Sequence, residues 1–100
     1  MAMNIKAPAV PISASTATAN AALLPAGSAL RYIRVVNNSA TSGCYVNAGA
    51  AGVTATSANI CLAPFESAVF ERDPTTDVNV AALLISGTAI ISCSLVGGPD

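Results

Sequence analysis

The sequence offers few residues from which a catalytic site could be assembled. It contains five acidic residues, three arginines, a single lysine (Lys6) and no histidine. A serine or cysteine nucleophile needs a neighbouring base, and Lys6, the one candidate for that role, lies in the N-terminal segment. The sequence therefore predicts a protein that is not an enzyme.

Four of the five acidic residues form two pairs along the chain, Glu66 with Glu71 and Asp73 with Asp77. The second pair lies in an expected loop and could contact Ca²⁺ there. Calcium loops, however, supply a longer string of oxygen ligands than two carboxylates. We interpret all four residues as solvated charges and predict no metal site.

The cysteines and glycines also lack the spacings that bind a metal or a cofactor. Cys44, Cys61 and Cys93 form no CxxC motif, so zinc, haem and iron–sulfur sites lack their ligands. We predict three reduced residues in the apolar core; one disulfide between two of them is the alternative. Residues 49–52 and 97–98 lack the glycine pattern of phosphate-binding loops, and we predict turns and no cofactor.

The composition favours contacts with other protein surfaces. Hydrophobic residues make up 53% of the chain and charged residues only 9%, where about 25% is usual. A surface with so little charge repels other proteins weakly, which predicts association with copies of itself, as a dimer or trimer. The net charge of −1 provides no basic patch, so we expect binding neither to nucleic acid nor to an anionic membrane.

Two apolar runs within residues 78–96, joined at Ser86-Gly87, predict a C-terminal β-hairpin. A two-residue turn would pair Leu84 with Ala89, and the residues farther from the turn would pair in the same register. One face of the hairpin would then be entirely apolar. It would carry Val78, Val80, Ala82, Leu84, Ala89, Ile91, Cys93 and Leu95. Polar residues interrupt the run at a period of two, which favours a hairpin over a membrane-inserting segment.

The other segments are typical of short strands. Residues 30–37 are rich in β-branched and aromatic side chains. Residues 65–72 lie between Pro64 and Asp73-Pro74, and their side chains alternate between two faces with the period of a strand. We predict an all-β sandwich of seven or eight strands, either jelly-roll-like or immunoglobulin-like.

We also predict how the chain is organised around this sandwich. Residues 1–13, which include two prolines, would form an extended arm. Residues 14–96 would form the single domain, and residues 97–100 a frayed end.

Several segments of residues 29–98 resemble small structural proteins of tailed bacteriophages that decorate or cement capsids. They read RYIRVVNNS, CYVNAG, GVTATSANICLAPFESAVFE and VNVAALLISGTAIISCSLVGG. The resemblance implies a virion protein on the capsid surface, made in the bacterial host cytoplasm and bound to the major capsid protein. It brings no catalytic residue with it.

Two further expectations concern surfaces. Leu83, Ile85 and Ile90 would lie on the second face of the hairpin near its turn, where we predict a subunit interface; coverage by the N-terminal arm is the alternative. Arg31 and Arg34 would pack their stems near a strand end or subunit boundary with their heads in water or on a carboxylate; in the functional interpretation that carboxylate belongs to another chain at such an interface. An alternative function is a head-fibre or tail module that binds a partner or a host glycan through its aromatics. These are Tyr32, Tyr45, Phe65 and Phe70.

Overall fold

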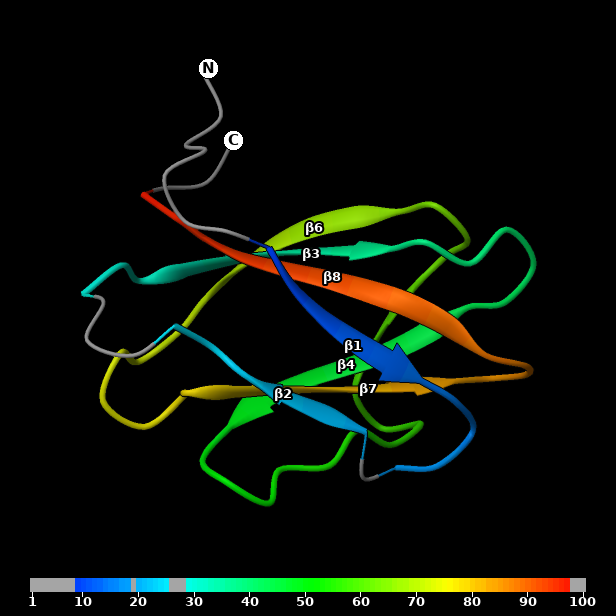
Figure 1. Cartoon of the computed structure of the whole chain (residues 1–100), viewed down its shortest axis with the longest axis horizontal. Coiled ribbons are helices and arrows are strands. Elements are labelled where there is room, and N and C mark those ends of the chain that lie inside the picture. The colour runs from blue at the N-terminus through cyan, green and yellow to red at the C-terminus, as the bar shows by residue number, and fades with distance from the viewer. Residues whose placement is uncertain (1–8, 19, 26–28, 98–100) are drawn as a thin grey trace.

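The protein is a β-sandwich (Figure 1). The computed structural model describes residues 9–18, 20–25 and 29–97, and these form eight strands and no helix. The strands are β1 (Val10–Ala14), β2 (Ala21–Leu23), β3 (Tyr32–Asn37), β4 (Cys44–Gly49), β5 (Ile60–Leu62), β6 (Ser67–Glu71), β7 (Asn79–Leu84) and β8 (Ala89–Val96). The predicted all-β class is confirmed.

The strand order identifies the topology. Sheet A has the order β1-β8-β3-β6, and sheet B has the order β2-β7-β4-β5. The first strand pairs with the last, β2 with β7, β3 with β6, and β4 with β5, all antiparallel. The chain is thus one long hairpin whose successive strand pairs fall in alternate sheets. This is the order of an eight-stranded jelly roll, which separates it from the immunoglobulin-like alternative.

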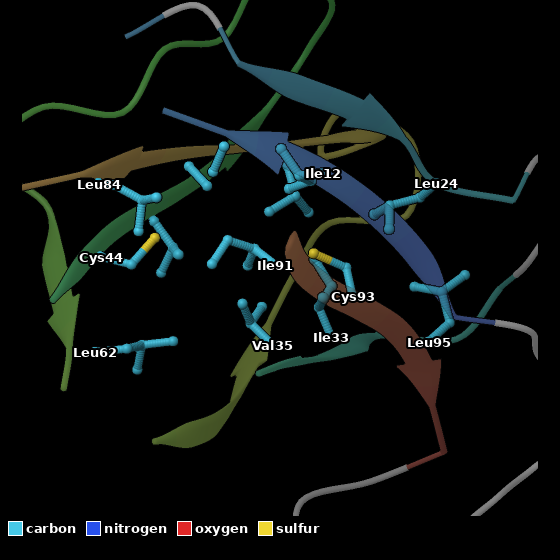
Figure 2. Packing of buried hydrophobic residues seen from close by; sticks show 14 residues of the cluster. Ile12, Leu24, Ile33, Val35, Cys44, Leu62, Leu84, Ile91, Cys93 and Leu95 are labelled. Carbon is cyan, nitrogen blue, oxygen red and sulfur yellow. The ribbon is translucent and has the colours of Figure 1, made fainter. Parts of the chain in front are cut away.

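The core lies between the two sheets and follows the period of two that a half-buried strand requires (Figure 2). In β3, Ile33, Val35 and Asn37 point inward, while Tyr32, Arg34 and Val36 are only half-buried. The largest fully buried apolar side chains come from both sheets. They are Ile12, Leu24, Ile33, Val35, Leu62, Val80, Leu84, Ile91 and Leu95.

The predicted pairing within the C-terminal hairpin is wrong, although its faces are right. β7 pairs with β2 and β4, whereas β8 pairs with β1 and β3. The connection around Gly87, whose φ is +72°, therefore crosses from one sheet to the other. Apolar alternation determines which face of a strand is buried but not its neighbour. The apolar residues of the two runs meet across the core instead of side by side.

The expected boundary between arm and domain also moves. β1 begins at Val10 and pairs with β8 from Val10↔Cys93 to Ala14↔Ala89. Residues 10–13, which were expected in the arm, therefore belong to sheet A, where Pro11 occupies an edge strand that tolerates it. Residues 1–8 of the expected arm, and 98–100 of the expected C-terminal end, lie outside the described residues.

Candidate functional site

Four connections meet at one end of the sandwich, at the right in Figure 1, and we call this the loop end. They follow β1, β3, β5 and β7, because consecutive strands run in opposite directions. Backbone hydrogen bonds join them. Ile85 N donates to Gly43 O at 3.1 Å, Phe65 N to Ser39 O at 3.2 Å and Leu84 N to Ser15 O at 2.8 Å. The four connections therefore form one bonded unit.

Asn37 is the centre of this unit. Its side chain is fully buried at the end of β3. Nδ2 donates to Ser42 O at 2.9 Å and Ala63 O at 3.1 Å, and Oδ1 accepts from Ser39 N at 3.0 Å. Because a buried amide is costly unless its hydrogen bonds are made, these contacts fix the positions of the β3–β4 and β5–β6 connections relative to each other.

Phe65 sits on this frame in an unusual backbone conformation. Its φ is +61°, the one positive φ at a non-glycine position among the described residues. A bulky residue is rarely found in this left-handed region, where strain costs about 1–3 kcal/mol. Glu66 stabilises the turn, since Ala63 N donates to Glu66 Oε1 at 2.7 Å. Phe65 nevertheless remains 67% exposed.

Exposed apolar side chains concentrate at the loop end. Among the described residues, five large hydrophobic residues are exposed; Phe65 and Ile85 lie in the connections of the loop end, and Ile90 lies at the adjoining start of β8. The other two, Leu23 and Ile60, lie on the edge strands β2 and β5 of sheet B. A rigid backbone that presents apolar groups to solvent is suited to binding another protein surface.

The structure does not bring all the predicted interface residues together. Leu83 is half-buried on the outer face of sheet B, in a row with Tyr45 and Cys61. Ile85 follows β7 at the loop end, and Ile90 lies on the outer face of sheet A opposite Ser13. The single face expected for Leu83, Ile85 and Ile90 is therefore wrong, since β7 and β8 lie in opposite sheets.

The two arginines of the predicted interface belong to sheet A. Arg34 lies on its outer face beside Ser94 and Val69, and Arg31 immediately precedes β3. Arg31 Nε is 4.0 Å from Glu71 Oε2, with both side chains more than 60% exposed. A pair this exposed contributes at most about 1 kcal/mol to stability.

An apolar cavity of about 200 Å³, which we call the side slot, opens between the sheets along edge strands β5 and β6. Its apolar lining includes Val35, Val46, Ala48, Ile60 and Phe70. Ile60 is 58% exposed, so the slot is open to solvent beside it. Three polar residues, Asn47, Glu71 and Asp77, also contribute to the lining. Sequence reasoning missed this feature because it depends on which edges of the two sheets meet.

Asp73 and Asp77 form hydrogen bonds within the β6–β7 loop. Asp73 Oδ1 accepts from Thr75 Oγ1 at 2.7 Å and Thr75 N at 2.9 Å, and Asp73 N donates to Asp77 Oδ2 at 2.9 Å. The hydrogen bonds from Thr75 lower the pKa of the Asp73 carboxyl. Residues 9–18, 20–25 and 29–97 contain no group of three or more side chains placed to hold a metal ion.

The three cysteines are free thiols, and the prediction that all three lie in the core is wrong for one of them. Cys44 and Cys93 are buried, and burial raises their pKa values to about 11 and about 12. Cys61 is exposed, because it occupies the outward position of the three-residue strand β5 between Ile60 and Leu62.

Comparisons with family models, with curated proteins and with solved structures find no match to this chain. Within the described part of the chain, no helix is long and apolar enough to cross a membrane.

Proposed function

We propose that this protein is a non-enzymatic structural component of a tailed-phage virion that decorates the capsid surface and stabilises it through protein contacts. The segments within residues 29–98 that resemble decoration proteins support the assignment. The jelly roll is compatible with it, since this fold occurs in viral capsid proteins as well as in lectins, but a fold alone does not specify a function.

The observation that carries the proposal is the loop end. There Ile85 is exposed beside connections held by the buried Asn37 amide, and Ile90 is exposed at the adjoining start of β8. Burial of each such side chain against a partner contributes about 1.5–3 kcal/mol before association costs. A protein present in many copies on a lattice can work with individually weak contacts, because simultaneous engagement multiplies them. The major capsid protein is the proposed partner for this surface.

Quantitative mass spectrometry of purified virions of the encoding phage tests this role. A decoration protein is expected in copies comparable in number to the major capsid protein. Absence from the particles would contradict the proposal. A handful of copies per particle would instead support the fibre or tail module, although Phe65 alone among Tyr32, Tyr45, Phe65 and Phe70 is exposed enough to stack on a glycan.

A substitution pair locates the contact on the molecule. Capsids lacking the protein should bind the purified wild type, and Ile85→Ser should weaken that binding. Leu23→Ser is the matched control, because Leu23 is 64% exposed and Ile85 57%, but Leu23 lies on edge strand β2. Equal binding by the two variants would exclude the loop end as the capsid-facing surface.

A further inference from the structure

Phe65 is exposed to solvent in the isolated chain, and its backbone conformation is strained. Its φ of +61° is strained for any bulky side chain, and 67% of the residue is exposed. Asn or Gly would hold the same turn with less strain. Strained residues persist where the conformation serves a function, which points to a contact made by this side chain.

The side slot has the size and chemistry of a receptor for one aromatic side chain. Its volume of about 200 Å³ lies below the range of about 300–1,000 Å³ typical of pockets for drug-sized ligands. The lining is mostly apolar and includes the ring of Phe70, which offers an aromatic partner. An occupant would also cover Ile60 at the opening, so one contact would shield two of the five exposed large hydrophobic residues.

We propose that Phe65 of one copy of this protein inserts into the side slot of a second copy. Phe65 and the opening of the slot lie along the same side of the sandwich, where β5, its loop and β6 form the edges of the two sheets. They are displaced along the strands: Phe65 lies in the loop, whereas Ile60 and Phe70 are at or near the ends of β5 and β6 farthest from it. A two-fold axis perpendicular to the strands therefore makes the contact reciprocal, and the dimer is closed.

The charges near this contact give it a characteristic salt dependence. Glu66 follows Phe65, and Glu71 and Asp77 line the slot, whereas Arg31 is 4.0 Å from Glu71. The contact brings carboxylates of two copies closer together, so screening by salt should strengthen it. An association driven by ion pairs between copies would weaken instead.

The variant Phe65→Asn separates this contact from a structural role. Sedimentation velocity over a concentration series should show that the wild type dimerises and that Phe65→Asn dimerises at least about tenfold more weakly. At a concentration where the wild type is monomeric, the thermal midpoint of Phe65→Asn should equal or exceed that of the wild type, because Asn tolerates a positive φ. The matched control Leu23→Asn replaces a side chain that is 64% exposed on the opposite edge of sheet B, and should leave dimerisation unchanged.

A mixing experiment identifies the slot as the receptor. Ile60→Glu places a carboxylate at the opening on an exposed position, so this variant should fold but remain monomeric. Phe65→Asn keeps an intact slot, and Ile60→Glu keeps an intact Phe65. Mixing the two should restore one of the two reciprocal contacts and yield a heterodimer weaker than the wild-type dimer.

Several outcomes would overturn the inference. They are a wild type that stays monomeric up to about 1 mM, a Phe65→Asn protein that dimerises normally, a Phe65→Asn monomer that melts below the wild-type monomer, and a mixture with no heterodimer. All these measurements use the purified protein alone. The inference can therefore fail while the capsid role stands, and virion copy counting tests that role separately.

Discussion

At the scale of single residues, the buried amide of Asn37 links segments that are far apart in the sequence. It lies at the end of β3, yet it binds backbone groups of two connections, including Ala63 O. From the sequence, Asn37 is the polar end of an apolar face shared with Ile33 and Val35. Its partners could not be inferred, because they reach it only when the β5–β6 connection folds over the end of β3.

We expect Asn37→Leu to lower the free energy of unfolding by about 2–3 kcal/mol. Leucine keeps the volume but removes the hydrogen bonds that Asn37 makes with the Ser39 amide and with the buried carbonyl groups of Ser42 and Leu62. Urea unfolding gives the value. Asn38→Leu is the control, since Asn38 is exposed and donates to the single oxygen Ser92 Oγ; it should cost less than about 1 kcal/mol. Equal losses would refute the central role of Asn37.

The two buried thiols should make stability depend on pH in the alkaline range. The pKa of an unfolded thiol is 9.0, whereas burial raises those of Cys44 and Cys93 to about 11 and about 12. Between these values the unfolded state releases protons that the folded state retains, so the unfolded state is favoured as pH rises. The free energy of unfolding should be insensitive to these thiols below pH 9.0 and fall above it.

Urea titrations between neutral pH and about pH 10.5 measure this effect over the range in which free thiols ionise. The double variant Cys44→Ala, Cys93→Ala should be less stable at neutral pH but should lose most of the alkaline decline. If the double variant kept the full alkaline fall in the free energy of unfolding, that fall would be due to other groups. Cys61→Ala should behave as the wild type, because the Cys61 residue is exposed.

At the scale of elements, sequence patterns located the strong strands and their faces but not their neighbours. Residues 30–37 and 65–72 contain β3 and β6, and the inward faces of β7 and β8 follow the predicted alternation. β2 was missed because Ala21–Leu23 is too short to show a period. Strand pairing could not be predicted because it depends on where the chain crosses from one sheet to the other. The loop end and the side slot depend on that pairing, so they could not be predicted either.

The pairing of β7 can be checked in solution by NMR. Backbone nuclear Overhauser effects should connect Ala82 with Val46, its partner across β4, and Ile91 with Ile12 of β1. A contact between the backbones of Ala82 and Ile91 would restore the hairpin register and contradict the jelly roll. Substitution to aspartate would not discriminate, since both residues are fully buried and either change should prevent folding.

At the scale of the whole molecule, the jelly roll places the first and the last strand side by side in sheet A, with β1 at the edge. β8 lies between β1 and β3, so it can complete its ladders only when the first strand is in place. Pairs such as Val10↔Cys93 span most of the chain, and long-range pairing of this kind slows folding. It also couples the first strand to the rest of the core.

This coupling predicts that a substitution in β1 destabilises the entire protein. Ile12 is 1% exposed and packs in the same core as Val35 and Ile91. Ile12→Ala should lower the free energy of unfolding by about 2–5 kcal/mol, through lost burial and the cavity left behind. Because the molecule should unfold cooperatively, amide exchange at Val35 in β3 should accelerate by the matching factor. If residues 10–13 formed a peripheral arm, Ile12→Ala would leave exchange at Val35 unchanged, and that result would remove β1 from the cooperative core.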